Sequence, residues 1–117
     1  MKKILFSGAV LLLLLCFSPV LLANTICAQN GAWYTIMYSG HYYVNGVSQE
    51  FSSGRLYASQ GYKQTIGNEV PAFVKVEYWN GSKWKILYDG AQYPFTTIKA
   101  SGSLFNPKYE TIDNSCW

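Results

Sequence analysis

Short runs of β-branched and aromatic residues, each interrupted by a glycine after a few positions, cover most of this 117-residue chain. Such runs are typical of β-strands, and glycines at this spacing mark the turns of an all-β protein. No segment carries a useful length of the apolar spacing that an amphipathic helix requires. The sequence therefore predicts an all-β fold, a single small antiparallel β-sandwich, with breaks at Gly40, Gly46, Gly54, Gly61, Gly67, Gly81, Gly90 and Gly102.

The runs between these breaks predict the strands themselves. We expect strands at residues 32–39, 41–47, 54–59, 62–66, 72–79, 83–88, 96–101 and 108–112. No internal repeat or low-complexity linker divides them, so a single domain is expected.

The amino terminus has the composition of an export signal. Lys2-Lys3 precede an apolar run that reaches Leu22, and Pro19 lies shortly before the small residue Ala23. Cleavage after Ala23 would give a signal peptide of residues 1–23 and a β-sandwich domain of residues 24–117, secreted or periplasmic. Cleavage after Ala28 is a second possibility. An uncleaved membrane anchor is a third, which polar residues and the proline within the apolar run disfavour.

Cysteine usage agrees with export. Loss of Cys16 with the signal would leave Cys27 and Cys116, one near each end of the mature chain. An even pair in an exported protein predicts a disulfide. Closing so long a loop would stabilise the fold by about 4 kcal/mol on the chain-entropy estimate. Cleavage after Ala28 would remove Cys27 and exclude this bond.

Charge and catalytic side chains exclude several functions. Without Lys2 and Lys3 the chain has seven basic residues against six acidic ones, which argues against a nucleic-acid partner. His41, the only histidine, lies beside tyrosines with no nucleophile motif nearby. The acidic residues are scattered, and no cluster has metal-ligand spacing. We expect no enzymatic activity, no catalytic residues, no metal and no cofactor.

The hairpin around Asn80-Gly81 has two competing registers. Asn-Gly favours a two-residue turn, which would place Lys85 beside Val76. A three-residue loop pairs Tyr78 with Trp84 and Val76 with residue 86, and it keeps the apolar side chains on one face. We therefore expect that loop, with Lys75, Glu77, Lys83 and Lys85 outward and a buried face of Val74, Val76, Tyr78, Trp84, Ile86 and Tyr88.

Aromatic residues are abundant, with 4 Trp and 10 Tyr, and most of them should fill the core. Trp79 differs because it lies beside the turn, and the alternation of its strand places it on the outer face with Lys75 and Glu77. The same alternation places Trp84 in the core. Leu104-Phe105 is an apolar pair where a turn between Gly102 and Pro107 is expected. An apolar turn is either a partner surface or a loop folded over the end of the sandwich.

Two segments resemble a known protein family. EYWNGSKWKILYDG at Glu77–Gly90 resembles the tryptophan-rich loop ECTGLAWEWWR of the cholesterol-dependent cytolysins, with Glu77, Gly81 and Trp84 at matching positions. IKASGSLFNPKYETI at residues 98–112 resembles a later strand and loop of the same carboxy-terminal domain. The resemblance covers residues 31–112 and implies a β-sandwich. The later tryptophans and the arginine of the first motif are replaced here, by Ile86, Leu87 and Tyr88.

The resemblance also implies a site and a partner. In that family the two loops dip into membrane, and a Thr-Leu pair recognises the sterol. The implied membrane- or sterol-binding residues are Trp79, Trp84, Ser103, Leu104 and Phe105. The sterol pair maps onto Leu104-Phe105, so its threonine hydroxyl is missing unless a shifted Ser103-Leu104 replaces it.

Three functions follow from these observations. The first is a secreted monomeric module that binds lipid membrane or sterol without forming pores, since no counterpart of the pore-forming domains is present. The second is a glycan- or protein-binding sandwich that uses surface aromatics. The third is a small structural or inhibitor-like protein whose aromatics are all core.

Overall fold

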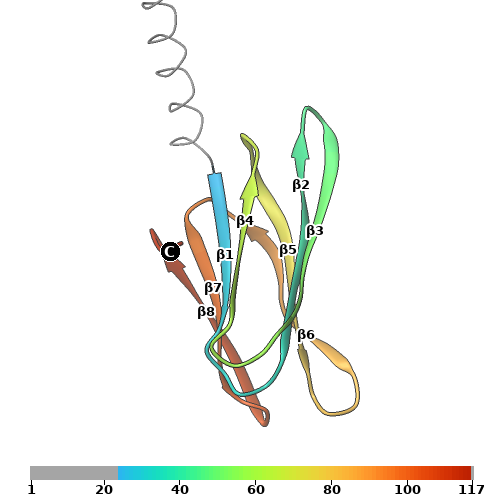
Figure 1. Ribbon diagram of the computed structural model, residues 1–117, viewed down its shortest axis with the longest axis vertical. Helices are drawn as coiled ribbons and strands as arrows, with labels where there is room; N and C mark the ends of the chain where they lie inside the picture. Colours follow the sequence, from blue (N-terminus) through green and yellow to red (C-terminus); the bar gives the residue numbers. More distant parts are fainter. Residues whose placement is uncertain (1–23, 117) are drawn as a thin grey trace, which may run out of the picture.

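The structure is a computed structural model that describes residues 24–116, so the predicted signal peptide lies outside the described residues. Within that range the chain forms two facing four-stranded sheets (Figure 1). The strands are β1 (Asn24–Asn30), β2 (Ile36–Val44), β3 (Val47–Leu56), β4 (Gly61–Ile66), β5 (Glu69–Trp79), β6 (Trp84–Gln92), β7 (Thr96–Ser103) and β8 (Asn106–Asp113). The predicted all-β sandwich is confirmed.

Strand order places the first and the last strand of the described residues in one sheet. The first sheet has the order β4-β1-β7-β8, and the second has the order β3-β2-β5-β6. Neighbouring strands are antiparallel, apart from the parallel pair β1 and β7. Strands β6 and β8 are therefore the edge strands on one side of the sandwich.

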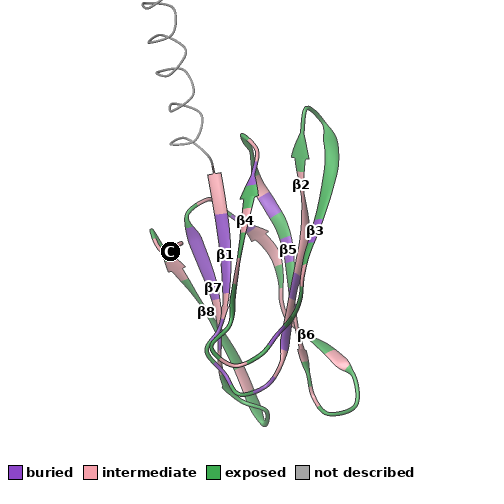
Figure 2. Cartoon of the chain, viewed as in Figure 1, coloured by how far each residue is buried: buried purple, intermediate pink, exposed green. Residues whose placement is uncertain are grey.

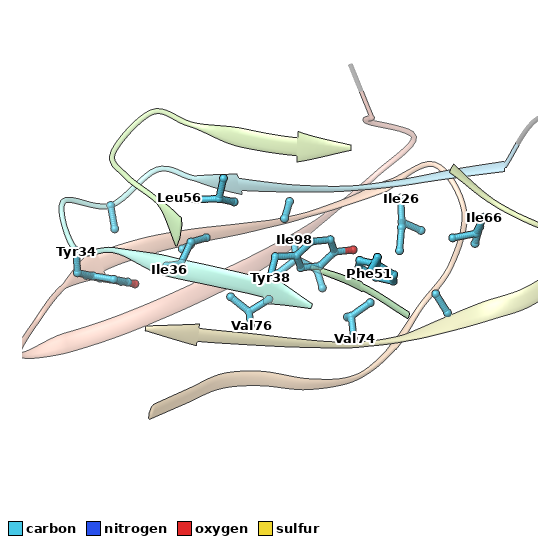
Figure 3. Packing of buried hydrophobic residues seen from close by; sticks show 14 residues of the cluster. Ile26, Tyr34, Ile36, Tyr38, Phe51, Leu56, Ile66, Val74, Val76 and Ile98 are labelled. Atoms are coloured by element: carbon cyan, nitrogen blue, oxygen red, sulfur yellow. The ribbon is translucent and has the colours of Figure 1, made fainter. Parts of the chain in front are cut away.

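The core lies between the sheets and takes side chains from both. Ile26 and Ile98 come from the first sheet, and Tyr38, Val74 and Val76 come from the second (Figure 3). Each of these five side chains is at most 2 % exposed. Burying such a side chain stabilises the fold by about 1.5–3 kcal/mol, so these alternating positions specify which face of each strand turns inward.

Strand β1 was not expected, and it is the most buried strand of its sheet. Ile26, Cys27 and Ala28 are all fully buried, because β1 lies between β4 and β7 and is covered on both faces. Its short length and polar ends gave no alternating pattern from which to predict a strand.

Four glycines that were expected to separate strands lie inside them: Gly40, Gly54, Gly90 and Gly102. Gly40 is in the middle of β2, where a Cβ would collide with the carbonyl oxygen of Phe73 on β5. Gly54 lies in β3 at a register shift, with a φ of 68°. The predicted strands 32–39, 41–47 and 54–59 are therefore wrong in their boundaries. The real turn is Asn45-Gly46, both at positive φ, which closes a two-residue hairpin.

A buried polar contact joins the two sheets. The hydroxyl of Tyr38 on β2 donates a hydrogen bond to Oε1 of Gln92 at 2.5 Å. Nε2 of Gln92 donates to the carbonyl oxygens of Cys27, at 2.9 Å, and Thr96, at 3.1 Å. Burial raises the pKa of the Tyr38 hydroxyl far above its ordinary value. This contact ties β2, β6, β1 and β7 together inside the core.

The predicted disulfide is present. Cys27 and Cys116 are bonded, with their Cα atoms 5.5 Å apart and a sequence separation of 89. The carboxy-terminal segment is also held by hydrogen bonds from the Thr97 hydroxyl to the Ser115 carbonyl and from the Ser115 amide to the Phe95 carbonyl at 3.1 Å. The segment therefore closes the outer face of the first sheet over Cys27 and Thr97.

The predicted register of the β5–β6 hairpin is wrong. Trp79 pairs with Trp84 across a four-residue loop, and a bulge at Leu87 then shifts the ladder so that Val76 pairs with Tyr88. Oδ1 of Asn80 accepts hydrogen bonds from the amides of Ser82 and Lys83, both at 2.9 Å, and this stabilises the longer loop.

Because the register differs, some residues of the predicted buried face are exposed or only half-buried. Val74 and Val76 are buried as expected, and Tyr78, Trp84 and Tyr88 are half-buried. Ile86 is 58 % exposed, because it pairs with Glu77 on the outer face. The three lysines of the hairpin are exposed and Glu77 is half-buried.

Candidate functional site

Four connections lie at one end of the sandwich, which we call the loop end. They are residues 31–35, 57–60, 80–83 and 104–105. Figure 1 shows them together at the bottom, and Figure 2 shows that this end is largely exposed. The two loops singled out in the sequence, 80–83 and 104–105, are therefore at the same end of the molecule.

Trp33 is the most exposed aromatic residue of the β1–β2 connection. Its side chain is 93 % exposed, although its neighbours Ala32 and Tyr34 are 2 % and 7 % exposed. Two buried neighbours fix the backbone on either side, so the indole points outward from a held segment. Sequence reasoning placed Trp33 in a strand and missed it.

Asn30 holds this connection in place. Its Nδ2 donates hydrogen bonds to the carbonyl oxygens of Tyr34, at 2.7 Å, and Leu56, at 2.9 Å. Its Oδ1 accepts from the amide of Ala32 at 3.0 Å. Asn30 is fully buried, so these three bonds replace water for the backbone groups of the turn.

Tyr34 joins the connection to the β7–β8 hairpin. Its hydroxyl donates to the carbonyl oxygen of Ser101 and lies 3.3 Å from that of Lys108. Burial raises the pKa of this hydroxyl, so it keeps its proton at neutral pH. Beside it lies a cavity of about 270 Å³, lined by Trp33, Tyr34, Gly102, Ser103 and Leu104.

The β7–β8 turn presents the predicted apolar pair. Ser103 pairs with Asn106, which leaves Leu104 and Phe105 as the two turn residues. Leu104 is 43 % exposed and lines the cavity, whereas Phe105 is 98 % exposed. Gly102 has a φ of 78°, and a Cβ there would collide with the Asn106 carbonyl oxygen. The turn is thus not folded over the end of the sandwich, and Phe105 has no core contact.

The β5–β6 hairpin presents a second aromatic pair. The rings of Trp79 and Trp84 meet edge to face, with centroids 5.4 Å apart. The guanidinium of Arg55 lies 5.9 Å from the centre of the Trp84 ring. With Thr35 these residues line a cavity of about 150 Å³ on the outer face of the second sheet. Trp84 is therefore on the same face as Trp79 and not in the core.

The predicted site residues thus lie at one end in two groups. Ser103, Leu104 and Phe105 are grouped with Trp33, and Trp79 is grouped with Trp84. A groove between the bases of the two hairpins is lined by Tyr78, Ile86, Leu87, Pro107, Lys108 and Tyr109. The binding role of the two groups stays a prediction.

The second sheet also has a shallow polar depression on its outer face. Ser39, Glu50, Ser52 and Lys75 line it beside His41. His41 stacks on Phe73, with ring centres 5.5 Å apart, and no hydrogen bond links it to a serine or carboxylate of residues 24–116. Over the same range no group of three His, Cys, Asp or Glu side chains could hold a metal. No helix there is long and apolar enough to cross a membrane.

Solved cytolysin structures have the same arrangement of strands. Suilysin from Streptococcus suis matches 81 % of this chain with a TM-score of 0.60 and 13 % identity. Listeriolysin O matches 79 % with a TM-score of 0.56 and 16 % identity. A pneumolysin structure matches 79 % with a TM-score of 0.57 and 16 % identity. This chain has the fold of a cytolysin domain.

The cytolysin likeness covers about four fifths of this chain and a much smaller part of each cytolysin. The chain spans about a quarter of those proteins, 24 % of suilysin and 23 % of listeriolysin O. No known protein-family profile and no curated protein sequence matches it. The resemblance inferred from two short motifs is therefore confirmed as a likeness of fold.

Proposed function

We propose that this protein is a secreted module that attaches to lipid membranes by its loop end. The observation that carries the proposal is the pair of nearly fully exposed side chains Trp33 and Phe105, at 93 % and 98 % exposure. Both lie in tight connections at the same end, next to the half-exposed Leu104. Exposed apolar side chains gathered at one place indicate a partner surface.

The energetics suit a weak, reversible attachment. Tryptophan favours the headgroup boundary of a bilayer. Each large apolar side chain that leaves water contributes about 1.5–3 kcal/mol. The hydrogen bonds of Asn30 and Tyr34 already order the connections, so little conformational entropy is lost on binding.

The cytolysin fold supports a membrane as the partner. Pneumolysin, which shares the fold, has been solved as a membrane pore complex. This chain matches only 24 % of that protein. We therefore propose binding without pore formation, by a monomer that is exported and has no enzymatic activity.

A sterol is a candidate partner within the membrane. Ser103 and Leu104 line the same cavity as Trp33, so a hydroxyl and apolar surface lie together there. Oγ of Ser103 accepts a hydrogen bond from the Asn106 amide at 3.2 Å and keeps its own proton for a second partner. This pair supports the shifted Ser103-Leu104 reading of the missing Thr-Leu pair.

Sedimentation with liposomes tests the proposal directly. Trp33→Ser and Phe105→Asp should each reduce pelleting at least tenfold, because each removes an apolar group from the interface. Tyr93→Ser is the matched control, since Tyr93 is an aromatic residue with 60 % exposure at the opposite end. The melting temperature of all three variants should stay within a few degrees of the parent. Vesicles with and without cholesterol separate sterol dependence from general attachment.

The polar depression favours glycan binding as a second candidate. It has a volume of about 610 Å³, and His41, Glu50 and Lys75 line it with two serines. One pneumolysin structure is described as that of a sugar-binding protein. Binding to a glycan array without pelleting on vesicles would favour this function over membrane attachment.

A further inference from the structure

Charge is distributed unevenly along the sandwich. Arg55, Lys83, Lys85 and Lys108 lie in or close to the connections of the loop end, and the side chain of Lys99 lies against Gly31 there. Glu77 lies at the same end, and Glu110 pairs with Lys99 on the neighbouring strand. The rest of the described chain carries the basic residues Lys63 and Lys75 with the acidic residues Glu50, Glu69, Asp89 and Asp113. Arg55, Lys83, Lys85 and Lys108, which we call the basic ring, therefore flank the apolar tips, although the described residues as a whole include seven basic and six acidic side chains.

Arg55 has a special position in this ring. It is exposed, and its guanidinium is held near the Trp84 ring, at 5.9 Å from the centroid. No carboxylate pairs with it among residues 24–116. Arg55 also lines the 150 Å³ cavity with Thr35, Trp79 and Trp84. The cavity thus combines a cation with a hydroxyl and two aromatic rings.

The donors of this cavity have no partners within the described chain. Neither indole nitrogen of Trp79 and Trp84 donates a hydrogen bond there, and the Thr35 hydroxyl makes none. A planar guanidinium presents two parallel donors, which match the oxygens of a phosphate group. Indole N–H and hydroxyl groups at a bilayer surface lie in the headgroup region, where phosphate oxygens can accept their hydrogen bonds.

We propose that the loop end recognises anionic phospholipid, with Arg55 contacting a headgroup phosphate in the Thr35–Trp79–Trp84 cavity. Lys83, Lys85 and Lys108 add attraction to the charged surface. This inference rests on the proposed membrane attachment and names the lipid class. A basic residue near an anionic membrane strengthens binding about fivefold, so the ring adds substantially to the apolar tips.

Vesicle pelleting with defined lipids tests the inference. The full mature chain is mixed with phosphatidylcholine vesicles, or with vesicles containing about one third phosphatidylserine, at low salt and at 0.5 M sodium chloride. Salt at that concentration shortens the screening length to under about half its value at 0.1 M. We expect at least tenfold stronger binding to the anionic vesicles at low salt and loss of most of this difference at high salt.

Three variants separate a phosphate site from diffuse charge. Arg55→Gln should weaken anionic binding about fivefold. Arg55→Lys keeps the charge but loses the planar donor pair, and it should weaken binding about twofold. Lys63→Gln is the control, because Lys63 is an exposed lysine on β4 that lines neither candidate site and lies away from the loop end. It should bind like the parent protein.

Each contrary result has a distinct meaning. Equal binding to both vesicle types, still blocked by Phe105→Asp, would overturn the anionic-lipid inference and leave membrane attachment standing. Equal losses in Arg55→Gln and Lys63→Gln would overturn the Arg55 site. Retention on heparin without pelleting on either vesicle would assign the basic ring to sulfated glycans. Absence of pelleting together with absence of heparin retention would overturn both proposals.

Discussion

The Tyr34 hydroxyl donates a hydrogen bond to the carbonyl oxygen of Ser101, and this bond couples the β1–β2 connection to the end of strand β7, far away in the sequence. Trp33 belongs to the β1–β2 connection and Leu104 to the turn that follows β7, and both side chains line the cavity beside Tyr34. The exposed apolar side chains of the loop end therefore share one rigid base.

Removal of that hydroxyl should weaken membrane binding without touching an apolar tip. Tyr34→Phe keeps the ring but removes the bond to Ser101, at a cost of about 0.5–1.5 kcal/mol in unfolding free energy. Vesicle affinity should fall because the connections must then be ordered on binding. Urea unfolding and vesicle pelleting measure the two effects. Tyr109→Phe is the control, since Tyr109 is 45 % exposed; equal effects in both variants would refute the coupling.

The corrected hairpin register predicts different costs for two isoleucines. Ile86 is 58 % exposed and Ile36 is fully buried, although both lie in strands of the second sheet. Ile36→Ala should reduce the unfolding free energy by about 2–5 kcal/mol. Ile86→Ala should change it by less than about 1 kcal/mol. Denaturant titration of both variants checks this, and a large loss from Ile86→Ala would restore the register expected from the sequence.

The hairpin also explains what the sequence could not reveal. Alternation correctly identified Val74 and Val76 as buried, because β5 keeps a period of two at these positions. It did not predict the bulge at Leu87, where the ladder changes phase. Near the turn, the Trp79–Trp84 contact and the Asn80 hydrogen bonds determine which residues pair. Beyond the bulge, burial of side chains in the core determines the pairing. A regular ladder cannot satisfy the turn contacts and the core packing at the same time. The position of a bulge cannot be predicted from the pattern of apolar and polar residues.

The candidate site was predicted only where a turn signal framed it. Gly102 and Pro107 marked Leu104-Phe105 as a turn, and both residues are exposed. Trp33 follows no such signal, since its exposure depends on Asn30, whose buried hydrogen bonds exist only in the folded chain. Tertiary contacts therefore decide part of the site.

Buried tyrosines predict a loss of stability at alkaline pH. Burial raises the pKa of Tyr38 in the folded protein, while the unfolded chain ionises near the ordinary value of 10.0. Above about pH 10 the unfolded state holds fewer protons than the folded state, so stability falls by up to about 1.4 kcal/mol per pH unit for this group. Below that pH both states are protonated and the contribution is fully present.

Tyr38→Phe tests this assignment. The variant should lose about 1–3 kcal/mol at neutral pH, because Oε1 of Gln92 loses its donor inside the core. Its stability should then fall less steeply than that of the parent between pH 10 and 11. Urea titrations across this range give both quantities. An unchanged slope would mean that other tyrosines, such as Tyr62 and Tyr88 with their raised pKa values, carry the alkaline effect.

The disulfide should contribute to stability but not directly to the loop end. Cys27 and Cys116 close a loop with a sequence separation of 89, and opening it should cost about 4 kcal/mol in unfolding free energy. Cys27→Ser combined with Cys116→Ser should therefore lower the denaturation midpoint. The folded fraction should still pellet with vesicles, because Trp33 and Phe105 are held by other contacts. Mass measurement after alkylation of the unreduced parent should show no free thiol. Two alkylated thiols, or a double variant as stable as the parent, would contradict this role.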